Sequence, residues 1–288
     1  MSEIQYWIWL TRIDGLGSIR IQKLLEKFKQ PKNIWMAKKE ELIKVDKVGD
    51  EIANKILDKR YRLNLEKYEN YMKKNEIEII TIYDECYPKK LKELYDKPIV
   101  LYVKGNKNIL NEFSLAIIGC REYSKYGEIV SKDIAYKIAK SGIVTVSGLA
   151  RGIDSFAHEA TLKAGGRTIA VIGSGLDNIY PRENIALADE IVRSGGVIVS
   201  EYIIGTKPAK MNFPARNRII SGLSNGVVVI EAKKKSGTMI TVDFALEQGK
   251  DVFAVPGSVL SKNSEGTNEL IKQGAKLITN IKDIIEEF

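Results

Sequence analysis

The sequence predicts an α/β protein in which a doubly wound, mostly parallel sheet follows a small all-helical domain. Three observations support this prediction. From Phe113 onward short apolar runs alternate with amphipathic stretches, most of these runs end in glycine-rich turns, and residues 1–65 instead space their apolar residues as helices do. We therefore expect a helical domain at 1–65, a connector with short strands at 66–112 and a sheet domain at 113–288.

The composition limits the classes of protein to consider. The 288 residues suffice for one large and one small domain, and 45 Lys and Arg against 37 Asp and Glu give a net charge of +8, which permits a polyanionic partner. One histidine and two distant cysteines provide no metal-ligand spacing, so we expect no metal. We expect a cytoplasmic protein with reduced thiols and no membrane contact, because no leader-like start and no membrane-length apolar run is found.

The first 65 residues contain two similar hairpin motifs. Residues 13–17 read IDGLG and precede apolar residues with helical spacing up to Pro31, while residues 45–49 read VDKVG, with Lys47 in place of Gly15. The pattern predicts a helix-hairpin-helix or SAM-like bundle. Its glycines would let backbone amides approach a phosphate, but a purely structural bundle fits the pattern equally well.

Residues 66–112 are expected to connect the two domains. Residues 77–83 and 99–103 are rich in β-forming residues, and Tyr87-Pro88 with a lysine-rich helical piece separates them. No catalytic grouping occurs in this region.

The remaining chain repeats a strand, a glycine turn and a helix. Apolar runs without a polar face are expected to form strands at 115–118, 143–146, 168–172, 197–199, 227–230 and 252–255. In a doubly wound sheet, ligands bind beyond the carboxyl ends of the strands. The residues that follow each run are therefore the candidates for a binding site.

Glycines and arginines follow several of these runs. The glycines expected to approach phosphate are Gly119, Gly148, Gly173 and Gly175. Arg121 and Arg151 lie close to two of them in sequence. A dinucleotide site is not supported, because Asn178 stands where the fingerprint has its third glycine and no acidic residue follows at the required distance. There is also no Walker phosphate loop, so we expect no cofactor.

Residues 209–230 combine cations, an aromatic residue and a helix before a buried strand. Lys210, Phe213, Arg216 and Arg218 gather at or near the start of this helix, where the helix dipole favours an anion. An aromatic ring among cations suits a stacked base beside its phosphates. The alternative is that Phe213 packs in a core and the arginines form solvated ion pairs.

Two groups of residues resemble catalytic arrangements without requiring catalysis. Ser236-Gly237-Thr238 precedes a helix and is either an N-terminal cap or an anion cradle. Asp154 and His158 are four residues apart on one helix and are either an acid/base pair or satisfied interior polar groups. We expect no catalytic residues.

The motifs together resemble the DprA/Smf DNA-processing protein family. They occur in family order over residues 113–280: IGCR at 118–121, VSGLARGID at 146–154, GSGLD at 173–177 with Tyr180-Pro181, SEY at 200–202, FPARNRII at 213–220, SGT at 236–238 and VPG at 255–257. The helical start resembles the SAM-like domain of that family. Cys120 departs from the serine that the family usually has.

This resemblance implies an extended Rossmann-like sheet and a non-catalytic function in natural transformation. Members bind incoming single-stranded DNA, deliver it to the RecA recombinase past single-strand-binding protein, and form homodimers through the Rossmann-like domain. By position, Arg121, Lys210 and Phe213 match DNA-pocket residues, and Arg182 matches a position that is often basic. Arg216 and Arg218 belong to the same motif as Phe213.

Two further expectations leave alternatives open. Leu246, Leu270, Ile271 and Leu277 are candidate dimer-interface residues, and each is equally compatible with an ordinary core position. The alternative function is a nucleotide-processing enzyme or nucleotide sensor on a related Rossmann-like fold. Phosphoribohydrolases that resemble lysine decarboxylases carry a PGGxGTxxE motif, and here Thr241 stands where its glutamate would be.

Overall fold

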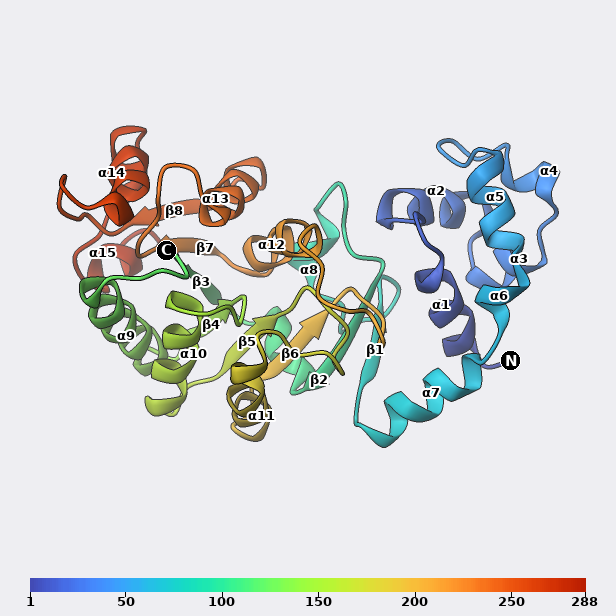
Figure 1. Cartoon of the computed structure of the whole chain (residues 1–288), viewed down its shortest axis with the longest axis horizontal. Helices are drawn as coiled ribbons and strands as arrows, with labels where there is room; N and C mark the ends of the chain where they lie inside the picture. The colour runs from blue at the N-terminus through green and yellow to red at the C-terminus, as the bar shows by residue number, and fades with distance from the viewer.

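The computed structural model describes residues 1–288, and its N-terminal part consists of short helices (Figure 1). These helices are α1 (Glu3–Arg12), α2 (Ser18–Phe28), α3 (Pro31–Met36), α4 (Lys39–Leu42), α5 (Asp50–Leu57), α6 (Lys59–Arg62) and α7 (Leu65–Lys74). Proline is the first residue of α3, where its missing N–H costs nothing, and it ends the preceding helical run as the sequence predicts.

The two hairpin motifs have the same backbone conformation. Gly15 and Lys47 occupy equivalent positions with φ of 80° and 63°, and Gly17 and Gly49 then cap α2 and α5. Arg20 joins the two hairpins, because its Nη1 donates to the Gly15 carbonyl at 2.7 Å and its Nε donates to the Lys47 carbonyl at 2.9 Å. The two predicted hairpins thus lie before helices in the structure, and Lys47 adopts the left-handed conformation that glycine adopts in the first copy.

A single sheet of nine strands follows the helices. The strands are β1 (Glu78–Thr81), β2 (Val100–Gly105), β3 (Ser114–Ile118), β4 (Val144–Ser147), β5 (Thr168–Val171), β6 (Val197–Ser200), β7 (Gly226–Val229), β8 (Asp251–Ala254) and β9 (Lys276–Leu277). Their order is β1-β2-β6-β5-β4-β3-β7-β8-β9, and the pairs from β6 to β9 are parallel. Each predicted apolar run is a strand, so the predicted α/β fold is confirmed.

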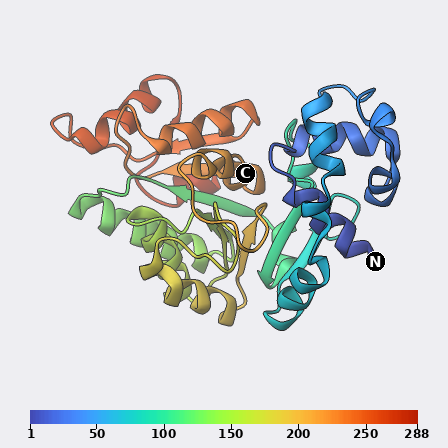
Figure 2. The same cartoon turned by 45° about the vertical axis from the view of Figure 1, so that its right-hand side comes forward.

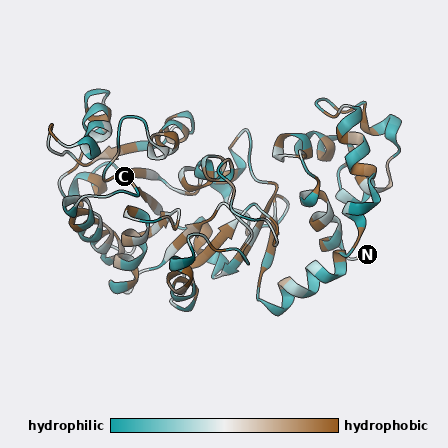
Figure 3. Cartoon of the chain, in the orientation of Figure 1, coloured by the Kyte–Doolittle hydropathy of each residue, from teal (hydrophilic) through white to brown (hydrophobic).

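Helices cover both faces of the parallel strands. The helices of this part are α8 (Lys89–Lys92), α9 (Lys125–Lys140), α10 (Ile153–Lys163), α11 (Ile185–Arg193), α12 (Asn212–Leu223), α13 (Gly237–Glu247), α14 (Glu265–Lys272) and α15 (Lys282–Ile285), with single turns at Lys107–Asn111, Arg182–Asn184 and Lys262–Ser264. In Figure 1, α9, α10 and α11 lie on one side of the sheet and α12, α13 and α14 on the other. The strands are the most apolar segments of the chain (Figure 3).

The chain reverses direction across the sheet between β3 and β7. From β3 the chain proceeds outward through β4 and β5 to β6, and α12 then returns it to β7 on the other side of β3. The loops that follow the carboxyl ends of β3 and β7 therefore run in opposite directions and leave a crevice between them. Open α/β sheets bind ligands in such a crevice.

The expected connector contributes to the same sheet. Strand β2 pairs antiparallel with β6, with Tyr102 opposite Ser200, and β1 pairs antiparallel with β2. The N-terminal helices lie beside this edge (Figure 2), and Tyr102 bonds Thr11 of α1 at 2.6 Å between hydroxyl oxygens. One buried apolar cluster joins the helical region to the sheet. Residues 66–112 thus form the end of the sheet as well as a link between the predicted domains.

The four candidate interface residues divide into two environments. Leu270 is 4% exposed and belongs to the core under α12, α13 and α14, so the structure contradicts its assignment to a surface. Ile271 is half-buried against the same core. Leu246 at 58% and Leu277 at 44% are exposed, near the end of α13 and on the edge strand β9.

The fold lacks two kinds of feature. None of its helices combines the length and the apolar character of a membrane span. No three His, Cys, Asp or Glu side chains cluster as metal ligands do.

Candidate nucleic-acid interface

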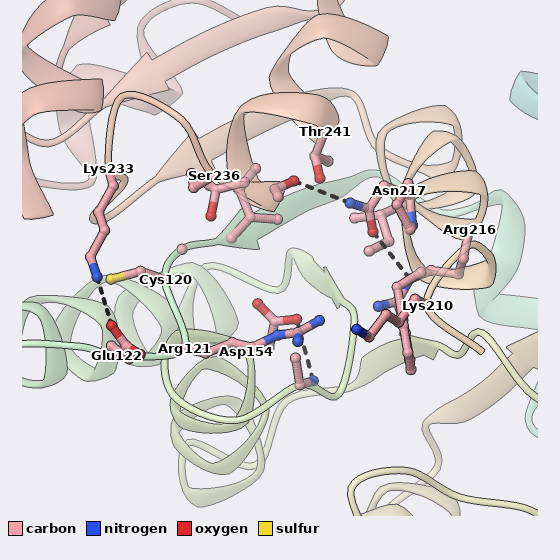
Figure 4. A pocket seen from close by; sticks show the side chains of 18 of the residues that line it. Cys120, Arg121, Glu122, Asp154, Lys210, Arg216, Asn217, Lys233, Ser236 and Thr241 are labelled. Carbon is pink, nitrogen blue, oxygen red and sulfur yellow. Dashed lines mark hydrogen bonds and ion pairs between the residues drawn. The ribbon is translucent and has the colours of Figure 1, made fainter. Parts of the chain in front are cut away.

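A cavity of about 570 Å³ occupies the crevice between β3 and β7. Its walls come from the loop after β3, the loop after β4, the start of α12 and the turn that precedes α13. Figure 4 shows labelled side chains that converge on this space from the loop after β3, from the starts of α10 and α12 and from the turn before α13. Residues far apart in sequence meet here because parallel strands end at the same edge.

Phe213 lies in the first turn of α12 and forms part of the cavity wall. Its ring packs against Gly173, where an added Cβ would come within 3.2 Å of the ring. The exposed ring of Tyr180 lies 5.6 Å from that of Phe213 between centroids, at an interplanar angle of 42°. The sequence indicates Tyr180 only as part of a motif, and its ring extends the aromatic surface of this wall.

Arg121 and Lys210 are the unpaired cations of the cavity. Both are exposed and line it, and the Arg121 guanidinium lies 5.6 Å from the Phe213 ring centroid, within the range of a cation–π contact. Neither has a carboxylate within ion-pair distance, whereas Lys233 of the same cavity pairs with Glu122 at 2.6 Å. The aromatic wall therefore has two cations that are free to meet an anion.

Arg216 is only 4% exposed and holds the backbone around the cavity in place. Its Nη1 donates to the carbonyls of Gly148, at 2.6 Å, and Val171, which fixes the loop after β4. Asp154 accepts hydrogen bonds from the same loop, at 3.2 Å from the Gly148 N–H and 3.4 Å from that of Ala150. Burial, partly offset by Asp154, lowers the pKa of Arg216 to about 10, so the guanidinium stays charged at neutral pH.

Arg218 does not belong to the cavity, contrary to the sequence prediction. It is 5% exposed and donates to Glu201 at 2.7 Å and to Asp96 at 2.9 Å. Residues two positions apart on a helix point about 200° apart, so Arg218 faces away from Arg216. The alternative reading of an ion-paired arginine is correct for this residue, although the pair is buried and not solvated.

Of the four predicted glycines and Arg182, only two glycines lie at the cavity. Gly119 and Gly148 line cavities of the site, and a Cβ on Gly148 would come within 2.8 Å of Arg216 Nη2. Gly173 and Gly175 do not line the site; Gly175 packs instead against the backbone at 203–204. Arg182 is exposed on a short helical turn and lies outside the cavity wall.

The polar side chains near the cavity do not form a catalytic pair with one another. His158 is fully buried, with its Nδ1 2.7 Å from the Thr168 hydroxyl and its Nε2 without a partner, so it is an interior polar group as the sequence allowed, but only one of its two nitrogens is satisfied. Ser236 occupies the cap position of α13 and lines the cavity, but its buried Oγ has no hydrogen-bond partner. Cys120 lies beside Glu231, and burial together with that carboxylate raises its thiol pKa to about 12. The thiol is therefore protonated and a poor nucleophile.

A family match identifies the class of protein to which the chain belongs. A family model described as DNA recombination-mediator protein A matches residues 78–288, which begin at the first residue of β1. The chain belongs to the DNA recombination-mediator protein A family. The resemblance to DprA/Smf proteins seen in the sequence is thereby confirmed.

Relatives and solved structures of this family extend over most of the chain. DNA processing protein DprA of Streptococcus pneumoniae is 48% identical over 72% of this chain and 73% of its own, and Protein Smf of Synechocystis is 38% identical over 99% and 72%. The X-ray structure of DprA from S. pneumoniae superposes with a TM-score of 0.79 at 39% identity, covering 100% of this chain and 99% of that one. A structure that describes the single-stranded DNA binding mode of DNA processing protein A from Helicobacter pylori has a TM-score of 0.66 at 36% identity, covering 73% and 95%.

Proposed function

We propose that this protein binds single-stranded DNA in the crevice between β3 and β7. The observation that carries the proposal is the meeting of an accessible aromatic pair, Phe213 and Tyr180, with two unpaired cations, Arg121 and Lys210. Bases stack on aromatic rings while cations neutralise the phosphates, and neither contact reads the base sequence. The single-stranded DNA binding described for the H. pylori relative supports the same assignment.

The proposal predicts a preference for single strands. Stacking on Phe213 requires an unpaired base, so a single-stranded oligonucleotide should bind more tightly than the same sequence as a duplex. Titrations of both at several salt concentrations measure this preference. Equal affinities at each salt concentration would contradict the proposed pocket.

Removal of the Phe213 ring tests the proposed stacking of a base on it. Phe213→Ala should weaken single-strand binding by about 1–3 kcal/mol, the usual value for one stacked base. Tyr71→Ala provides a matched control, because Tyr71 is an exposed aromatic residue on α7, outside the cavity. Equal losses in the two variants would remove the reason for assigning the base to Phe213.

We further propose, from the family resemblance, that the bound strand is protected in the cytoplasm and passed to RecA during natural transformation. RecA filament formation on DNA covered by single-strand-binding protein should accelerate when this protein is added. Lys210→Ala should reduce the acceleration in proportion to its loss of DNA binding. No acceleration by a DNA-binding wild-type protein would reject RecA loading and leave the DNA site intact.

The alternative of a nucleotide-processing enzyme has less support from the cavity. Its carboxylates are engaged, since Glu122 pairs with Lys233 and Asp154 accepts from the loop after β4. Thr241 lines the cavity at the position where the related hydrolases have glutamate. Incubation with nucleoside monophosphates should therefore release no base, and measurable release would favour the enzyme.

A further inference from the structure

A second, smaller hollow adjoins the main cavity on the side of Tyr180. This inner pocket has a volume of about 40 Å³ and shares Arg121, Phe213 and Arg216 with the main cavity. About 10–15 Å³ of cavity volume on this scale holds one water molecule, so the inner pocket has room for a group of a few heavy atoms, such as one small anion. A phosphate-sized group is therefore a ligand that fits it.

Three arginines from three different segments line the inner pocket. Arg121 follows β3, Arg151 follows β4 and Arg216 belongs to α12. Both hydrogen bonds from Arg216 Nη1 go to backbone carbonyls, whereas its Nη2 has no hydrogen-bond partner. Nη2 is not completely buried, so it remains available to an acceptor that enters from the cavity. Such an acceptor can approach through the inner pocket, because Arg216 lines both this pocket and the main cavity.

The charges around the inner pocket leave it positive. The carboxylates that face these arginines are Asp154, which is held by the Gly148 and Ala150 N–H groups, and Glu183, which pairs with Arg151 at 2.8 Å. Arg121 and Arg216 against Asp154 leave one positive charge. The Arg151–Glu183 pair is largely exposed, so it is weak and Arg151 can turn to a bound anion at little cost.

We propose that the inner pocket binds the terminal phosphate of a DNA strand, an inference that rests on the proposed function. An internal phosphodiester presents two free oxygens and one negative charge. A terminal phosphate presents three free oxygens and a charge close to −2 at neutral pH, so each of the three guanidinium groups can donate to its own free oxygen once Arg151 turns from Glu183. The strand leaves through the single ester oxygen toward Phe213 and Tyr180, where its first base stacks.

Short oligonucleotides that differ only at their ends test this proposal. Binding of hexathymidylate with a 5′-phosphate, with a 3′-phosphate and with hydroxyls at both ends is compared by calorimetry. One phosphorylated form should bind about tenfold more tightly than the hydroxyl form, as one added charge-assisted hydrogen bond provides, and that form identifies which end is held. Equal affinity of all three rejects the terminal-phosphate subsite, whereas no binding by any of them rejects the proposed function itself.

Arg151→Ala separates end recognition from general phosphate contact. This exposed residue can be replaced without disturbing the core, and the tenfold ratio between phosphorylated and hydroxyl oligonucleotides should fall close to one. Arg60→Ala is the matched control, because Arg60 is an exposed arginine paired with Asp58 in the helical domain, and it should keep the ratio. An Arg151→Ala variant that weakens all three oligonucleotides by the same factor overturns the proposal.

Discussion

Arg121 and Lys210 are the residues through which phosphate binding is most directly measured. Both are exposed in the cavity without a carboxylate partner, so each is available to neutralise one phosphate. Arg121→Ala and Lys210→Ala should each weaken single-strand binding and make the slope of log affinity against log salt shallower by about 0.7. Salt titrations of the folded variants measure the slopes.

The control for these two variants is a lysine outside the site. Lys74→Ala removes an exposed cation at the end of α7 and should leave the slope unchanged. Wild-type slopes for both Arg121→Ala and Lys210→Ala, with folding intact, would mean that the crevice is not the DNA site.

The burial of His158 predicts how the free energy of unfolding depends on pH. The Thr168 hydroxyl donates to the Thr145 carbonyl, so it accepts from His158 Nδ1–H, and the buried Nε2 lone pair has no partner. Burial lowers the pKa of His158 to about 3, against about 6.5 in the unfolded chain. Between these two values the unfolded state binds the extra proton, so the stability contributed by neutral His158 is present above pH 6.5 and is lost as the pH falls.

A neutral replacement removes this acid sensitivity. From pH 7 to pH 5 the wild type should lose about 2 kcal/mol of unfolding free energy through His158, and His158→Gln should not lose that part. Urea unfolding at the two pH values measures the difference, and no other histidine contributes to it. At pH 7 the variant should be destabilised by about 1 kcal/mol through the lost Thr168 hydrogen bond. Parallel pH profiles for the two proteins would refute the lowered pKa of buried His158.

At the scale of elements, one side of helix α12 lines the cavity and the opposite side anchors the helix to the rest of the fold. Its first turn presents Phe213 to the cavity, whereas Arg218 anchors the opposite side to Glu201 after β6 and to Asp96. Arg218→Ala leaves the largely buried Glu201 carboxylate without its cation and should lower the unfolding free energy by about 3–5 kcal/mol. Denaturant unfolding measures this loss.

The same variant distinguishes an anchoring residue from a DNA contact. In the protein that remains folded, Arg218→Ala should keep the wild-type salt slope for single-stranded DNA, because its guanidinium does not face the cavity. A stable Arg218→Ala protein with a shallower slope would restore Arg218 to the binding site.

The strands and hairpins were predictable because their signals are local. Apolar runs without a polar face give buried strands, and IDGLG and VDKVG give turns of one conformation. The pairing of β2 with β6 was not predictable, because it joins residues about 100 positions apart and depends on which sheet edge is free. The place of Arg218 on the side of α12 away from the cavity was also missed, since an arginine on a helix fits a ligand and a buried carboxylate equally well.

At the scale of the whole molecule, the helical domain and the sheet are joined by polar contacts as well as by a common core. The Ser18 hydroxyl at the start of α2 donates to the Asp96 carbonyl at 3.1 Å, and Arg218 holds the same residue from α12. The cavity is therefore connected to the helical domain through one helix and one loop. This arrangement fixes the hairpins relative to the crevice.

We propose that a second copy of the chain binds at the exposed end of the sheet. Strand β9 is the last strand, its outer edge has no partner, and Leu277 on it and Leu246 near the end of α13 are exposed leucines. We expect a dimer at tens of micromolar by light scattering. Leu246→Glu and Leu277→Glu should then give folded monomers, because a charge buried in an interface would be desolvated and unpaired.

Leu270 and Ile271 provide the contrast that separates an interface from a core. Leu270→Glu should unfold the domain, since Leu270 lies among the buried residues under α14, and half-buried Ile271→Glu should destabilise it less. Circular dichroism beside light scattering distinguishes an unfolded variant from a folded monomer. Because both exposed leucines lie away from the crevice between β3 and β7, the monomeric variants should retain single-strand binding at each site. A wild-type protein that stays monomeric at tens of micromolar, or Leu277→Glu and Leu246→Glu variants that remain dimers, would place the contact elsewhere or exclude it.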